Sequence, residues 1–391
     1  MTEYRLEELF DLQMGKTPSR NNPEYWNSED HKWISIGDLS RCGKYISETK
    51  ECLSDKAIKE SGISLIPAET VVMSFKLSIG KTAITAEPMY SNEAIMSFRD
   101  RGLVNLLPDY VYYLLSGRDW DEGTNKAVMG KTLNKATLSK IKVRIHDVEQ
   151  QKEIVSVLDI VSSIIASRQQ ELSALDDLIK SRFVEVFGDP VANTTGWNTA
   201  LLHEVTSKIG SGATPRGGKE SYQREGISLI RSMNVHDGRF EYKDLAHITD
   251  EQAAQLDNVA VEPNDVFINI TGASVARSCV VPIDVLPARV NQHVAIIRCI
   301  SDRILPLFAN NMFLNSRFKG QLLDIGESGG ARRQAITKQQ LEALTIILHP
   351  LQLQEDFAAF VSQVEKSKAV VQKALSEVQL LFDSLMQQYF G

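Results

Sequence analysis

Apolar residues recur at alternating steps of four and three in two stretches of the chain, residues 147–188 and 350–391. Such a 3.5-residue period over about five heptads is typical of a helix that supercoils against another helix. The first series consists of Ile154, Leu158, Val161, Ile165, Leu172, Leu175, Ile179 and Val186, with Arg168 and Arg182 in its gaps. The second series includes Phe357, Val361, Val364, Val371, Leu375, Val378 and Phe382, with Lys368 in its gap.

The two helical series share one register, because the second lies 203 residues after the first. We therefore expect both helices to pair as an antiparallel hairpin inside one chain. A helix of about 40 residues is roughly 60 Å long. Pairing of this kind would give the molecule pseudo-two-fold symmetry and hold the regions before each helix apart.

The regions that precede the two helices are copies of one another. Gly15–Pro18 recurs as Gly212–Pro215 at an offset of 197, and Ser78–Lys81 recurs as Ser274–Arg277 at an offset of 196. Within each copy, short β-branched runs alternate with turns and with short helical stretches at 108–116 and 306–315. The sequence thus predicts an α+β fold with two duplicated mixed α/β domains separated by a long two-helix coiled coil. The expected boundaries are 1–146, 147–188, 189–349 and 350–391.

The net charge of −7 is concentrated on the two helical segments, which hold 7 basic and 13 acidic residues. The two modules are near neutral, so the helices are poor surfaces for DNA and any phosphate-binding face must be a local patch on a module.

The sequence carries no recognisable catalytic motif. Gly80-Lys81-Thr82 looks like the end of a phosphate-binding loop, but Phe75 stands where that loop requires glycine. The seven histidines lack metal-ligand spacing, and the four cysteines are widely spread, as expected of reduced thiols in a cytoplasmic protein. No signal peptide or membrane-spanning run is recognisable. We therefore expect a chain without a catalytic site, a metal or a bound cofactor.

Small polar and basic residues on matched loops are the candidate DNA contacts, since such residues approach phosphates closely in tight turns. In the first module they are Lys16, Thr17, Ser19, Arg20, Lys76, Ser78, Lys81, Thr82, Lys126 and Lys131. In the second module they are Thr214, Arg216, Lys219, Thr271, Ser274, Arg277, Ser278, Arg332 and Arg333. Base edges could be read by Arg231, Asn234, Asn269 and Gln334. Taken singly, each of these residues is as readily explained by a solvated turn.

The order module–helix–module–helix resembles the specificity subunit of type I restriction–modification systems over essentially all 391 residues. The resemblance is carried by the Gly-x-Thr-Pro loops, by the loops at 78–81 and 274–277, by the junctions at 141–151 and 345–354, and by Phe-Gly at the end of both helices. The second module departs from the first in having Ala276 in place of Gly80.

The resemblance implies that each module is a target recognition domain that reads one half of a bipartite, asymmetric site in double-stranded DNA. The helices would set the gap between the half-sites and dock two methyltransferase subunits, with restriction subunits joining the complex. S-adenosylmethionine, ATP and magnesium would be used by those partners. Two other interpretations remain open: a tandem-domain protein-binding scaffold without DNA specificity, and a self-contained methyltransferase.

Overall fold

The protein is described by a computed structural model that covers residues 1–76, 78–118, 120, 125–127, 130–215, 217–328 and 334–391. It divides into two compact units, residues 1–169 with 373–391 and residues 170–372. Each unit therefore combines one module with half of each long helix. The boundary falls within the helices and not at their ends, because the apolar seam packs each helix half onto the core of a module.

The first unit is built on two mixed sheets. The larger has the strand order β2 (Phe10–Met14), β9 (Ile95–Asp100), β6 (Val71–Ser74), β7 (Thr82–Thr85) and β4 (Tyr45–Ile46), antiparallel except for β4 beside β7. The smaller has β3 (His31–Ile34) antiparallel to β5 (Glu51–Leu53) and parallel to β8 (Tyr90–Ser91). Strand β1 (Thr2–Arg5) pairs with β12 (Lys142–Ile145), and β10 (Asn125–Ala127) pairs with β11 (Gly130–Thr132).

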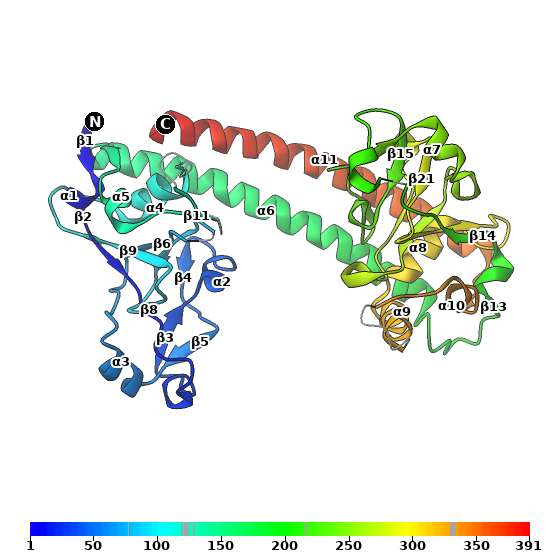
Figure 1. Ribbon diagram of the computed structural model, residues 1–391, viewed down its shortest axis with the longest axis horizontal. Helices are drawn as coiled ribbons and strands as arrows, with labels where there is room; N and C mark the ends of the chain where they lie inside the picture. The colour runs from blue at the N-terminus through cyan, green and yellow to red at the C-terminus, as the bar shows by residue number, and fades with distance from the viewer. Residues whose placement is uncertain (77, 119, 121–124, 128–129, 216, 329–333) are drawn as a thin grey trace. The chain divides into compact units, whose positions relative to one another are not determined.

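Short helices cover the first unit's sheets. They are α1 (Leu6–Leu9), α2 (Ile36–Leu39), α3 (Asp55–Ser61), α4 (Pro108–Ser116) and α5 (Lys135–Ser139). Helix α4, which the sequence predicted, packs against β6 and β7. Its apolar face joins the largest core of this unit, and α4 and α5 lie beside the beginning of α6 (Figure 1).

The second unit repeats this topology. Its larger sheet has the order β14 (Thr206–Ser211), β22 (Val294–Cys299), β19 (Val266–Asn269) and β20 (Ser278–Val280). Its smaller sheet has β15 (Ile227–Ile230) antiparallel to β18 (Ala246–Ile248) and parallel to β21 (Ala288–Val290). Two further pairs are β13 (Thr199–Leu201) with β23 (Thr345–Ile347) and β16 (Val235–His236) with β17 (Arg239–Phe240). The helices are α7 (Asp250–Ala254), α8 (Pro306–Leu314), α9 (Ser316–Ser328) and α10 (Lys338–Glu342). The smaller sheets have the same pairing in both units, and the larger sheets share four antiparallel strands in the same order, which confirms the predicted duplication.

The long helices α6 (Val148–Phe187) and α11 (Leu351–Phe390) contain 40 residues each. In the first unit, Ile154 and Leu158 near the start of α6 share a core with Met386 near the end of α11. In the second unit, Ile179 near the end of α6 shares a core with Phe357 near the start of α11. Because beginning packs beside end in both units, the helices run antiparallel, as the heptads predicted. None of the helices in the described ranges is long and apolar enough to cross a membrane.

Every residue of the two predicted seams, from Ile154 to Ile179 and from Phe357 to Phe382, is buried or half-buried. The end of the first seam differs from the prediction. Phe183 and Phe187 are each only 2% exposed and continue the seam in steps of four, while Arg182 and Val186 lie beside it. A straight helix has 3.6 residues per turn, so its apolar stripe drifts away from a strict heptad where it faces a module and not a partner helix.

Candidate nucleic-acid interface

Both Gly-x-Thr-Pro motifs begin at a glycine that has no room for a side chain. A Cβ on Gly15 would lie 2.1 Å from the carbonyl oxygen of Ser91, and one on Gly212 would lie 1.8 Å from that of Val290. Ser91 belongs to β8 and Val290 to β21, the matched parallel strands of the two smaller sheets. The motif glycine therefore lets the loop cross closely over a strand, and the loop reaches the same place in both units.

The predicted loops at 78–81 and 274–277 close two matched hairpins, β6–β7 and β19–β20. The residue before the basic position has a left-handed backbone in both, with φ of 88° at Gly80 and 65° at Ala276. Glycine tolerates this conformation, whereas alanine pays roughly 1–2 kcal/mol for it. The substitution of Ala276 for Gly80 thus leaves the backbone shape unchanged and stores strain directly before Arg277.

The second unit carries an open hollow of about 620 Å³ at this hairpin. It brings together four residues that the sequence predicted: Thr271, Ser274, Arg277 and Gln334. The guanidinium of Arg277 has no hydrogen-bond or ion-pair partner among the described residues. These four residues therefore bring an arginine, two hydroxyls and an amide to one concave surface, which suits a ligand rich in hydrogen-bond acceptors.

Two lining residues, Ser232 and His293, were missed by the sequence reasoning. Ser232 follows the predicted Arg231, and His293 lies two residues after Asn291, which matches Asn92 of the first module. The repeat around Asn291 was the signal that could have located His293.

Three predicted contacts are corrected by the structure. Asn234, Asn269 and Ser278 are all 0% exposed. The amide of Asn234 donates to the carbonyl of Glu241 at 2.9 Å, and that of Asn269 donates to the carbonyl of Ser232 at 2.9 Å.

The hydroxyl of Ser278 donates to Oδ1 of Asn310 at 2.7 Å, also inside the unit. These three polar side chains satisfy buried groups and hold loops in place, because a buried polar atom without a partner is costly. They do not reach a surface where a base edge could lie.

Other predicted residues of the second unit remain at its surface. The guanidinium of Arg231 is half-buried, lies 5.4 Å from the ring of Tyr222 and donates to the carbonyl of Asp244. The exposed hydroxyl of Thr214 donates to Oε1 of Gln292 at 2.5 Å. Arg216, Arg332 and Arg333 lie outside the described residues, and only the backbone is described at Lys219, Lys126 and Lys131.

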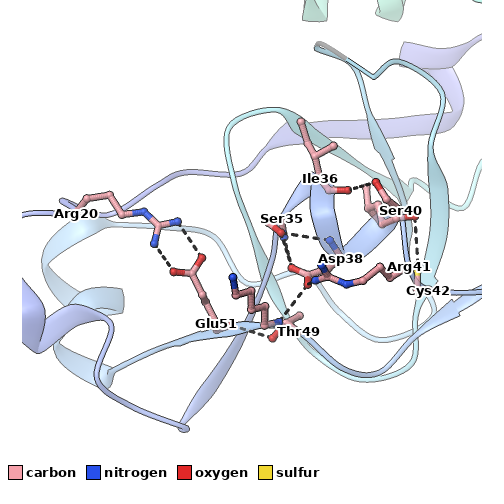
Figure 2. A network of polar contacts seen from close by, with 11 residues as sticks. Arg20, Ser35, Ile36, Asp38, Ser40, Arg41, Cys42, Thr49 and Glu51 are labelled. Atoms are coloured by element: carbon pink, nitrogen blue, oxygen red, sulfur yellow. Dashed lines mark hydrogen bonds and ion pairs between the residues drawn. The ribbon is translucent and has the colours of Figure 1, made fainter. Parts of the chain in front are cut away.

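In the first unit, Lys81 is oriented by the end of α2. Its ammonium donates to the hydroxyl of Ser40 at 2.5 Å. Helix α2 is itself fixed by Asp38, which is bonded to Ser35 and to Arg41 (Figure 2). Burial alone would raise the pKa of Asp38, but hydrogen bonds from Ser35, the amide of Lys50 and Arg41 outweigh it and lower the pKa. Ser78 and Thr82 flank Lys81 on the same hairpin, half-buried.

Arg20 in the first unit is already paired. Its two terminal nitrogens donate to both oxygens of Glu51 at 2.5 and 3.1 Å (Figure 2). Its guanidinium lies 3.7 Å from the ring centre of Trp26. This bidentate pair neutralises the charge of Arg20 and aligns its planar group.

The remaining first-unit candidates are also engaged within the unit. The ammonium of Lys16 donates to the carbonyl of Ser61, and the hydroxyl of Thr17 donates to the carboxylate of Glu93. The carbonyl of Ser19 accepts from the Trp26 ring nitrogen at 3.1 Å, and the ammonium of Lys76 lies 5.3 Å from the ring centre of Phe75.

The candidate residues thus lie on matched loops and hairpins of two similar units. Among the described residues, no group of three or more His, Cys, Asp or Glu side chains is placed to hold a metal ion. Fold and site together define a tandem-module protein joined by a helical spacer.

Several known proteins are similar to this chain in sequence or in fold. Residues 1–176 match the family described as the type I restriction modification DNA specificity domain. The specificity subunit of the type I restriction enzyme MjaIX from Methanocaldococcus jannaschii is 23% identical over 253 residues, covering 60% of this chain and 58% of that protein. The EcoR124I/EcoR124II specificity subunit from Escherichia coli is 25% identical over 154 residues, covering 37% of each chain. The matches thus span about half the length, or less, of these curated relatives.

Two solved structures share the fold over the whole chain. A crystal structure of the S subunit of a type I restriction–modification system from M. genitalium has a TM-score of 0.53 at 12% identity, covering 100% of this chain and 96% of that one. A chain from a structural study of complex assembly and conformational transition of the type I system has a TM-score of 0.56 at 16% identity, covering 99% and 97%. The chain is thus similar to type I specificity subunits in sequence over part of its length and in fold over essentially all of it.

Proposed function

We propose that this chain is the non-catalytic subunit that recognises DNA sequence in a type I restriction–modification complex. Each unit reads one half of a bipartite, asymmetric site in double-stranded DNA. The observation that carries the proposal is the hollow beside Arg277, on a hairpin whose backbone recurs in the first unit. An unpaired guanidinium among hydroxyl and amide groups suits the oxygen and nitrogen acceptors that DNA presents on its bases and phosphates.

The long helices serve as the spacer and as the docking surface for protein partners. The segments 147–188 and 350–391, which form them, hold 13 acidic against 7 basic residues, so they disfavour contact with phosphates and favour a protein surface. The partners are two methyltransferase subunits, with restriction subunits joining through the complex. S-adenosylmethionine, ATP and magnesium are used by these partners, and this chain holds no cofactor of its own.

The test is to exchange residues 1–146 for the corresponding module of another specificity subunit. The chimera and the parent are each expressed with the cognate methyltransferase subunit, and the methylated motifs are read by sequencing the host genome. We expect one half-site to change, while the other half-site and the gap stay as in the parent. Unchanged motifs in a chimera that still methylates would sink the proposal.

A direct binding measurement separates this function from that of a protein-binding scaffold. Affinity of the assembled complex for a duplex carrying the motif should fall steeply as salt rises, because each neutralised phosphate releases a counterion. A scaffold without DNA specificity would bind the motif duplex and a scrambled duplex equally weakly. S-adenosylmethionine binding by this chain alone would instead support a self-contained methyltransferase.

A further inference from the structure

A chain of hydrogen bonds in the second unit leads from the Gly-x-Thr-Pro loop into the hollow. The hydroxyl of Thr214 donates to Oε1 of Gln292 at 2.5 Å, and Nε2 of Gln292 lies 3.1 Å from Nε2 of His293. On the other side of the ring, Nδ1 of His293 lies 2.5 Å from the hydroxyl oxygen of Thr271. His293 and Thr271 both line the hollow, as does Arg277.

The orientation of the Gln292 amide sets the donor and the acceptor in each link of this hydrogen-bonded series. Because Oε1 of Gln292 accepts from Thr214, the amide nitrogen of Gln292 faces His293 and donates to it. Nε2 of His293 must then be the acceptor, so the proton of the neutral ring is on Nδ1. Nδ1 donates to the oxygen of Thr271, and the hydroxyl hydrogen of Thr271 is left to point elsewhere. The tautomer follows from the network and turns Thr271 into a donor.

The first unit has only the beginning of such a chain. Thr17, the counterpart of Thr214, donates to Glu93, and the next residue is Ala94 where the second unit has His293. A carboxylate cannot donate onward, and alanine offers no ring to orient. The imidazole link is therefore a feature of the second unit within this pair, which accords with two modules that read different half-sites.

We infer that His293 is a positioning residue for base specificity, because it orients the hydroxyl of Thr271. The hollow then suits a base edge that offers two acceptors, and the ligand is the O6 and N7 edge of guanine. The inference rests on the proposed function. Arginine is the usual bidentate partner of that edge in the major groove. Adenine and cytosine present an amino donor there, and a hydroxyl held as a donor rejects it.

Phosphate oxygens accept hydrogen bonds as guanine does. Every nucleotide carries the same phosphate, however, so an oriented donor at Thr271 would not distinguish one sequence from another there. A free hydroxyl would rotate to donate to a phosphate without help from His293. A fixed tautomer matters only where donor edges must be refused, which favours a base over the backbone.

The decisive variant is Gln292→Glu, which keeps the shape of an exposed side chain but removes its donor. Glutamate accepts from Thr214 and from His293, so in the neutral ring the proton lies on Nε2 and Nδ1 becomes the acceptor. Thr271 must then donate to Nδ1 and can no longer donate into the hollow. Thr271→Val removes the donor itself, and His293→Phe removes the imidazole ring that orients it, while Thr271→Ser retains both. Thr249→Val, which loses the N-cap of α7 in the same unit and lies outside the hollow, is the control for stability alone.

The complex of the full chain with its methyltransferase subunits is titrated with duplexes in which each base pair of one half-site is varied. The wild type should prefer G·C at one position of the half-site read by the second unit by roughly tenfold or more. Gln292→Glu, Thr271→Val and His293→Phe should lower that preference below about threefold, and Thr271→Ser and Thr249→Val should keep it.

A preference that all variants retain would overturn the inference and leave the proposed function standing. A loss of affinity shared equally by every duplex, in complexes that melt as the wild type does, would assign the hollow to phosphate instead and would also overturn it. A wild-type complex that prefers no base pair in either half-site would contradict the proposed function itself.

Discussion

The side-chain oxygen of Gln151 accepts a hydrogen bond from the backbone amide of Leu107 at 3.0 Å. The amide nitrogen of the same glutamine donates to the carbonyls of Asn105 at 3.0 Å and His146 at 2.9 Å. Gln151 is 0% exposed, and it lies in the first turn of α6. It therefore joins the start of the long helix to the loop that enters α4.

The second unit contains the same clamp, 203 residues later. Gln354, also 0% exposed, accepts from the amide of Leu305 at 2.9 Å and donates to the carbonyls of His349 at 2.8 Å and Arg303 at 3.4 Å. A polar side chain buried in this way satisfies three backbone groups at the junction between the module and the helix. The two clamps fix the beginning of each long helix to its own module.

Gln151→Leu should lower the free energy of unfolding by about 2–4 kcal/mol, because it takes the side-chain partner away from one amide and two carbonyls at the junction. Chemical denaturation followed by circular dichroism measures the change. Gln150→Leu is the matched control, since Gln150 is the exposed neighbour on the same turn, and its effect should stay within about 0.5 kcal/mol. Equal losses in both variants would show that the clamp does not stabilise the unit.

The helix seam gives a second pair of matched substitutions. Leu158 is 0% exposed and Ile160, two residues further along α6, is 57% exposed. Leu158→Asp buries a carboxylate without a partner and should cost about 3–5 kcal/mol. Ile160→Asp should change stability by no more than about 0.5 kcal/mol. Thermal melting of both variants checks this, and a stable Leu158→Asp protein would contradict the seam.

Heptad positions were predictable from the sequence because their period is local and repeats for five heptads. The same holds for the duplicated module, since matched motifs at a near-constant offset require no knowledge of contacts. How deeply each seam residue is buried could not be predicted from the sequence. Leu172 and Leu375 are only half-buried, whereas Phe183 and Phe187 carry the seam into a module core.

The candidate site was predictable only in part. Thr271, Ser274 and Arg277 follow one another on a single hairpin, so a loop motif was enough to group them. Asn269 and Ser278 flank the same hairpin but face inward.

Residue type does not tell which side of a short strand is buried, and an amide suits a loop carbonyl as well as a base. His293 reaches the hollow from another part of the chain, and only tertiary structure brings it beside Thr271.

The glycine of the second Gly-x-Thr-Pro loop has a nearby control. Gly212→Ala would place a Cβ 1.8 Å from the backbone oxygen of Val290, so β21 or the loop must move. We expect a loss of at least about 2 kcal/mol, in the range of severe overpacking. Gly210→Ala, two residues earlier, meets no atom within 4 Å. There the change should be neutral or stabilising by up to about 1 kcal/mol. Denaturation curves for both variants test the close approach, which similar curves would refute.

Stability should fall in mild acid because of His349. This side chain is 4% exposed, lies against the rings of Phe187 and Trp197, and has Nε2 3.2 Å from the carbonyl oxygen of Phe187. Burial lowers the pKa of His349, although its backbone hydrogen bonds act in the opposite direction. The unfolded chain therefore takes up a proton at a pH where the folded chain does not. The contribution of neutral His349 to the free energy of unfolding is fully present above the ordinary histidine pKa of about 6.5. It is lost progressively as the pH falls below that value.

His349→Gln removes this titration while keeping a side chain that can donate to Phe187. The free energy of unfolding is measured at intervals from pH 7.5 to 5.0, a window chosen above the ordinary pKa of carboxylates. The wild type should lose up to about 1.4 kcal/mol per pH unit for each histidine that stays neutral when folded. The variant should be less stable at pH 7.5 and should show a flatter decline. Burial also lowers the pKa of His146 in the first unit, so a residual slope is expected that His146→Gln removes in turn. A slope in the His349→Gln protein as steep as that of the wild type would exclude His349 as its source.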